Sequence, residues 1–174
     1  MKSVILIPVP NADPVINEWR KKYDSALKGI PAHITLLYPF KPPNKIETED
    51  IKVLKDFFKK IEHFEFQLCQ PNSFPTVLFL EPHPKEIFVN LTKQLVQIFP
   101  DYLPYEGKFS SVNPHATIAN LSDEKNLKRI KPAIISGLSK KLPIMQKVTE
   151  AWLMIEKEDG YWEIKEKFSF QKQV

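Results

Sequence analysis

The stretch that decides the fold of this chain is PAHITLLYPF, residues 31–40. A proline leads into a run of strand-forming residues and Pro39 closes it, which is the pattern of a short strand with fixed ends. Side chains at positions i and i+2 of a strand point to the same face. His33 therefore shares a face with Thr35, whereas Ile34 and Leu36 point to the opposite, packed face.

A second stretch, NPHATIAN at residues 113–120, repeats this pattern later in the chain. Here His115 shares a face with Thr117, again just after a proline. If the two strands meet, two imidazoles and two hydroxyls converge. An imidazole titrates near neutral pH, so one ring can act as a general base while the other acts as a general acid. Threonine hydroxyls can donate hydrogen bonds to phosphate oxygens, so the pattern predicts a site for acid-base chemistry on a phosphate.

Two other interpretations of the paired motifs stay open. A histidine beside a threonine is often an ordinary half-exposed pair on one strand, and histidine is also a common metal ligand. Neither motif brings a carboxylate, a cysteine or a second histidine at ligand spacing, so we expect no metal and no cofactor. His63, at the end of an expected helix, and His83, between two prolines, fit structural roles.

The elements around the motifs occur in a repeated order of helix, His-x-Thr strand, helix, strand and strand. The spacing of apolar residues predicts helices over 13–27, 48–60, 85–99 and 121–136. Strands are expected over 3–9, 33–38, 64–68, 76–80, 115–119, 142–148, 151–155 and 161–170, with a loop at 71–73 and a hairpin turn at 159–160.

This order predicts an α+β fold of two antiparallel-sheet lobes with outer helices, related by a pseudo-twofold axis, with a cleft between them. Each half alone would leave a sheet face exposed, so the two halves are expected to pack together. We therefore expect one bilobal domain over residues 1–174, with approximate repeat halves 10–82 and 83–170.

The composition fits one globular domain. The chain has 25 Lys and Arg against 21 Asp and Glu, a formal charge of +4. That balance suits an anionic partner, although a lysine-rich surface explains it equally well. No apolar run is long enough for a membrane span or a signal peptide, and Cys69 is the only cysteine. We expect a cytoplasmic monomer that does not bind membranes.

The motifs HITL at 33–36 and HATI at 115–118 resemble the two His-x-Thr-x motifs of the 2H phosphoesterase superfamily. The stretch 31–40, the Asn-Pro-His at 113–115 and the DGYW hairpin at 159–162 are similar to a bacterial branch. That branch holds 2′-5′ RNA ligase-like proteins and cyclic nucleotide phosphodiesterases.

The resemblance implies a metal-independent phosphodiesterase that hydrolyses 2′,3′-cyclic or 2′-5′ phosphodiesters of nucleotides or RNA. It implies that His33 gives a proton to the leaving oxygen, that His115 activates water, and that Thr35 and Thr117 hold the phosphate. The pseudo-twofold makes the two histidines nearly equivalent, so the residues alone leave the acid and base roles open. A non-catalytic nucleotide or RNA-end binding module and an RNA 2′-5′ ligase are the alternative functions.

The chain departs from this family at one feature. Some relatives carry an arginine shortly after a motif, whereas the comparable positions here hold Leu37, Ala119 and Asn120. The phosphate charge would then be met by an imidazolium or by a more distant cation such as Lys41. Phe40 and Phe74, near loops, are candidates for stacking a base, whereas strand alternation places Tyr38 on the packed face.

Overall fold

The computed structural model describes residues 1–24 and 28–172. Within these residues the chain forms an α+β fold, as the sequence predicts. The elements are, in order, β1 (Ser3–Pro8), α1 (Asp13–Tyr23), β2 (His33–Leu37), α2 (Thr48–Phe58), β3 (Phe64–Ser73), β4 (Val77–His83), α3 (Glu86–Ile98), β5 (Ala116–Asn120), α4 (Glu124–Leu138), β6 (Ile144–Val148), β7 (Glu150–Glu156) and β8 (Trp162–Ser169).

The described strands form two antiparallel four-stranded sheets, with orders β2-β1-β7-β8 and β5-β4-β3-β6. The two orders match: a His-x-Thr strand lies at one edge of each sheet, beside the strand that precedes it in the chain. Each sheet combines strands from the early and the late part of the chain, because β1 pairs with β7 in one sheet and, in the other, β4 pairs with β5 and β3 with β6. Neither of the ranges 10–82 and 83–170 therefore forms a sheet of its own.

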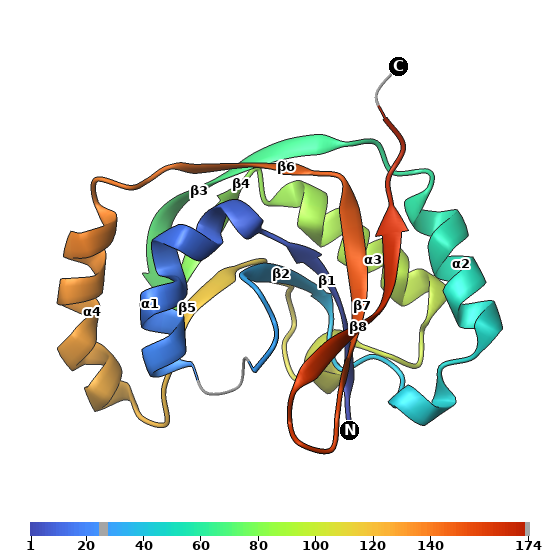
Figure 1. Cartoon of the computed structure of the whole chain (residues 1–174), viewed down its shortest axis with the longest axis horizontal. Coiled ribbons are helices and arrows are strands. Elements are labelled where there is room, and N and C mark those ends of the chain that lie inside the picture. The colour runs from blue at the N-terminus through green and yellow to red at the C-terminus, as the bar shows by residue number, and fades with distance from the viewer. Residues whose placement is uncertain (25–27, 173–174) are drawn as a thin grey trace.

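The helices lie outside the two sheets, with α1 and α4 together at one end of the molecule and α2 at the other (Figure 1). One large core joins the sheets to the helices, and it includes fully buried Ile5, Ile7, Phe58, Phe66 and Phe88. Successive strand residues alternate between faces, so Val4 and Leu6 of β1 belong to a second, smaller cluster on the opposite face of their sheet. No helix among the described residues is long and apolar enough to cross a membrane.

Two of the boundaries that differ from the sequence predictions lie in β3 and α1. The predicted loop at 71–73 is part of β3, because Pro71 pairs with Leu80 of β4. β6 pairs only with residues 64–68 of β3, so this proline lies where one side of the strand has no ladder partner and its missing N–H costs nothing. The helix expected over 13–27 ends at Tyr23, and residues 25–27 lie outside the described part.

Tyr38 also differs from its predicted position. It packs against the smaller cluster, whereas Leu37 takes the position in the large core beside Leu36. The ladder between β1 and β2 is irregular between Ile5 and Leu6, opposite this point. Such an irregularity shifts the facing of the residues that follow, so simple alternation fails at the end of β2.

Candidate active site

The two His-x-Thr strands occupy matching positions in the fold. β2 and β5 are the edge strands of their sheets, and they contact each other. The helices cross between the sheets: α1, which precedes β2, packs on β5, and α3, which precedes β5, packs on β2. A buried hydrogen bond from Thr92 Oγ1 of α3 to the Leu36 carbonyl, 2.9 Å long, fixes the second of these contacts.

Burial along both strands follows the alternation that the sequence predicts. His33 and Thr35 are half-buried, while Ile34 and Leu36 between and beside them are fully buried. The second motif repeats this pattern, with His115 and Thr117 half-buried and both Ala116 and Ile118 fully buried. Each motif therefore presents one imidazole and one hydroxyl on the face that is not packed into the large core.

Both imidazoles make the same hydrogen bond to the main chain two residues earlier. His33 Nδ1 lies 2.9 Å from the Pro31 carbonyl, and His115 Nδ1 lies 2.7 Å from the Asn113 carbonyl. A carbonyl oxygen can only accept, so Nδ1 carries the proton in each ring. In the neutral form of both rings, Nε2 is then the atom with a free lone pair.

Both imidazoles have a pKa below the ordinary value for histidine. Burial is the main cause for His33, whose pKa falls to about 4, with smaller contributions from the charges of Arg20 and His115. Burial also lowers the pKa of His115, opposed by its hydrogen bond to Asn113. The effect of His115 on His33 shows that the two rings are close enough to influence each other's charge.

Aromatic side chains surround His115. The ring of Phe79 lies 5.0 Å from the imidazole and the ring of Phe74 lies 5.4 Å from it, edge-on. Phe79 of β4 is buried and stands directly opposite Thr117 of β5, so it supports the motif from the neighbouring strand. Phe74, in the loop between β3 and β4, is 38% exposed. Of the aromatic candidates from the sequence, Phe74 is the one with a ring contact to a motif histidine.

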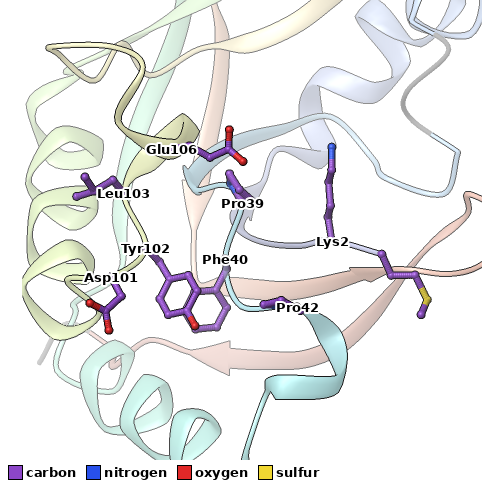
Figure 2. A pocket seen from close by; sticks show the side chains of 9 residues that line it. Lys2, Pro39, Phe40, Pro42, Asp101, Tyr102, Leu103 and Glu106 are labelled. Carbon is purple, nitrogen blue, oxygen red and sulfur yellow. The ribbon is translucent and has the colours of Figure 1, made fainter.

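Phe40 and Lys41 make their contacts elsewhere. Phe40 is buried, with its ring 5.0 Å from Phe99, and Lys41 Nζ is bound to Asp50 Oδ1 at 2.6 Å. The hollow beside Phe40, about 390 Å³, contains neither motif histidine among its lining residues (Figure 2). Its lining residues are Met1, Lys2, Pro39, Phe40, Pro42, Asp101, Tyr102, Leu103 and Glu106. Because Lys41 is already paired with a carboxylate, we do not include Phe40 or Lys41 in the candidate site.

Two residues of the site region, Phe79 and Arg20, are not among the candidates that the sequence motifs predict. Phe79 is identified only by the register of β4 against β5. Arg20 does leave a signal, because it follows Ile16 at helical spacing and so places a charge on the apolar face of α1. In the structure Arg20 is buried, and its charge acts on His33. Within the described residues, no group of three or more His, Cys, Asp or Glu side chains gathers in a way that could hold a metal ion.

Comparison with known proteins identifies relatives for nearly the whole chain. A family model described as the 2′-5′ RNA ligase superfamily matches residues 8–160. A Bacillus pumilus protein, named as a phosphoesterase by inference, is 26% identical over 171 residues and covers 95% of both chains. A Halalkalibacterium halodurans protein with the same kind of name is 26% identical over 180 residues, with 98% of both chains covered.

Solved structures with the same fold support this match. The Thermus thermophilus protein TT0787 superposes with a TM-score of 0.67 at 19% identity, covering 100% of both chains. E. coli LigT in complex with NADP⁺ has a TM-score of 0.61 at 17% identity, covering 98% of this chain and 97% of LigT. At these identities the likeness establishes the arrangement of the two sheets and their helices.

Proposed function

The chain belongs to the 2′-5′ RNA ligase superfamily, and from this membership we propose that it is a metal-independent phosphodiesterase acting on 2′,3′-cyclic or 2′-5′ phosphodiesters of nucleotides or RNA. The observation that carries the proposal is the matched pair of imidazoles on contacting edge strands, each with its proton on Nδ1. Two such rings can exchange protons through Nε2 on either side of a phosphate. Binding alone needs no such pair.

In the proposed reaction, a water oxygen attacks phosphorus and the bond from phosphorus to the leaving ribose oxygen breaks. In the direction that the family resemblance implies, His115 Nε2 takes the proton of the water, and protonated His33 gives its Nε2 proton to the leaving oxygen. His115 ends charged and His33 neutral, and proton exchange with solvent restores the pair. The Thr35 and Thr117 hydroxyls donate to the non-bridging phosphate oxygens.

The lowered pKa of His33 is consistent with this scheme once substrate is included. In the free protein burial disfavours the imidazolium, so both rings are mainly neutral at neutral pH. A bound phosphate anion favours a charged neighbour and raises the pKa of both rings. Substrate binding would therefore bring in the proton that the leaving oxygen later receives, and the phosphate charge would be met by this imidazolium.

We propose that Phe74 contacts the base of the substrate. Its ring is partly exposed, lies edge-on to His115, and is backed by Phe79, whose centroid is 4.6 Å away. An exposed aromatic ring beside the reacting groups can stack on a base of any sequence. The nucleotides in LigT structures, which include 3′-AMP, ATP and NADP⁺, support a nucleotide as the ligand of this fold.

The test is hydrolysis of 2′,3′-cyclic AMP by the purified protein, with the product identified by chromatography. We expect the 2′-phosphate, because the family resemblance places the 3′-oxygen beside His33. A predominant 3′-phosphate would mean that the ribose binds in the opposite direction or that the roles of the histidines are reversed.

Two further outcomes would contradict the hydrolase. Tight nucleotide binding without cleavage of cyclic or 2′-5′ substrates would indicate a binding module. Joining of a 2′,3′-cyclic phosphate end to a 5′-hydroxyl end, without hydrolysis, would indicate a ligase.

A further inference from the structure

The segment before His33 is held by a buried arginine of α1. Arg20 is 5% exposed, and its Nη2 donates to the carbonyls of Ile30 at 2.9 Å and Pro31 at 3.0 Å. Its Nη1 donates to Asn17 Oδ1 at 2.7 Å and lies 3.3 Å from Asp13 Oδ1. A planar guanidinium has five N–H donors in a rigid fork, whereas an ammonium has three on a single atom.

Asp13 completes the attachment from the first turn of the same helix. Its Oδ1 accepts the hydrogen bond from Arg20 and also the backbone N–H of Ala32, at 2.8 Å. Together the two side chains bind backbone groups of three consecutive residues, 30–32. The position of His33 at the start of β2 is therefore fixed from α1.

The Pro31 carbonyl links this attachment directly to the imidazole. It accepts from Arg20 Nη2 and, at 2.9 Å, from His33 Nδ1. The positive charge of Arg20 is thus separated from the ring by a single carbonyl group. The equivalent acceptor for His115 is the carbonyl of Asn113, an exposed residue, and no second side-chain donor to it is present among the described hydrogen bonds.

We propose that Arg20, together with Asp13, is the positioning pair for His33, and that the charge of Arg20 makes His33 the weaker base of the two imidazoles. The consequence for catalysis rests on the proposed function, whereas the positioning of the ring and the difference between the two imidazoles do not. Because Arg20 also donates to the carbonyl that His33 binds, the two motifs differ, although the pseudo-twofold relates them.

The charged groups near His33 support this direction. Arg20 of α1 and His115 of β5 both disfavour a charge on His33, and burial acts in the same direction on its pKa. Asp13 and Asp24 are the acidic groups that interact with Arg20, and the charge of Arg20 disfavours a charge on His33. When a phosphate anion raises the pKa of both rings, Arg20 opposes the rise at His33 alone. His33 would then remain the weaker base of the two imidazoles.

The test is an NMR pH titration of the imidazoles in the full-length, substrate-free protein, with the ring signals assigned from the His33→Ala and His115→Ala spectra. In Arg20→Met we expect the His33 titration to move upward by on the order of one pH unit. In Asp13→Asn the side-chain oxygen can still accept from Ala32, but the charge that offsets Arg20 is gone. The His33 titration should therefore move downward.

Opposite shifts in the two variants distinguish an electrostatic role from a structural one, because loss of positioning alone would move His33 in the same direction in both. Arg129→Met, at the only other arginine of the chain, is the matched control and should leave His33 unchanged. If Arg20→Met does not fold, Arg20→Gln, which has amide N–H donors but carries no charge, takes its place beside Asp13→Asn. An unchanged His33 titration in the folded variants, or shifts in the same direction, would overturn the proposal.

The same variants separate this inference from the proposed function. If the protein hydrolyses 2′,3′-cyclic AMP, we expect Arg20→Met to lower kcat by about 10²-fold, with partial recovery in Arg20→Lys and little change in Arg129→Met. An active wild type whose kcat is insensitive to Arg20 would overturn the positioning role. If the wild type cleaves no such substrate, the proposed function fails, and the titration still decides whether the charge of Arg20 acts on His33.

Discussion

At the scale of single residues, the candidate site contains two imidazoles that make the same kind of hydrogen bond to the main chain but lie in different surroundings. Replacement of His33 or of His115 by Ala should lower kcat on a 2′,3′-cyclic nucleotide by about 10²–10⁴-fold, because each variant removes one partner of the acid-base pair. The measurement is steady-state hydrolysis, with circular dichroism to show that the variant is folded.

His83→Ala is the matched control for this prediction, because His83 is exposed at the end of β4 and should be replaceable without loss of turnover. Thr35→Val and Thr117→Val should have smaller effects than the histidine variants, since each removes one neutral hydrogen bond to phosphate. A folded His33→Ala or His115→Ala protein with nearly full activity would rule out the two-histidine mechanism.

The lowered pKa of His33 also has a consequence for stability. An unfolded histidine titrates near 6.5, whereas His33 in the folded protein titrates at about 4. Between these values the unfolded state binds more protons, so the free energy of unfolding should fall as the pH is lowered through this window. Urea unfolding at several pH values measures the slope.

In His33→Ala this slope should be smaller than in the wild type. His115, whose pKa is also lowered, contributes in the same direction, so part of the slope should remain in His33→Ala. Equal slopes in the variant and the wild type would contradict the lowered pKa of His33.

At the scale of elements, α3 fixes the position of β2 although 48 residues or more separate them in the chain. Thr92 is 1% exposed and bonds the Leu36 carbonyl. Thr92→Val keeps the shape of the side chain but leaves a buried carbonyl without this donor, so we expect a loss of about 1–3 kcal/mol in the free energy of unfolding. Urea denaturation measures it.

The matched control is Thr149→Val, because Thr149 is exposed between β6 and β7. Its stability should stay within about 0.5 kcal/mol of the wild type. If Thr92→Val were as stable as this control, the hydrogen bond between α3 and β2 would contribute nothing measurable.

At the scale of the whole molecule, two sheets that each combine early and late strands bring the edge strands β2 and β5 together. The chemistry proposed there uses imidazoles and hydroxyls. We therefore expect hydrolysis of 2′,3′-cyclic AMP to be unchanged after dialysis against EDTA. The measurement is activity before and after dialysis, and after addition of divalent cations. Loss of activity that a divalent cation restores would instead favour a metal-assisted reaction.

The sequence by itself singled out the two His-x-Thr motifs and determined which face of a strand each histidine shares with its threonine. Buried Ile34 and Leu36 alternate with half-buried His33 and Thr35, and this period of two is imposed by the local geometry of a strand. The order of helices and strands follows from the same local periodicities, and it was sufficient to predict two antiparallel-sheet lobes.

The tertiary structure alone decided which strands pair and what surrounds each histidine. The pairing of β1 with β7 and of β3 with β6, the placement of Tyr38 in the smaller cluster, and the ion pair of Lys41 with Asp50 all depend on register and on contacts between distant segments. The shared Pro31 carbonyl, through which Arg20 reaches His33 but not His115, is of the same kind. Local periodicity fixes the face on which a side chain lies, whereas the free energy of packing distant segments selects the neighbours that it meets there.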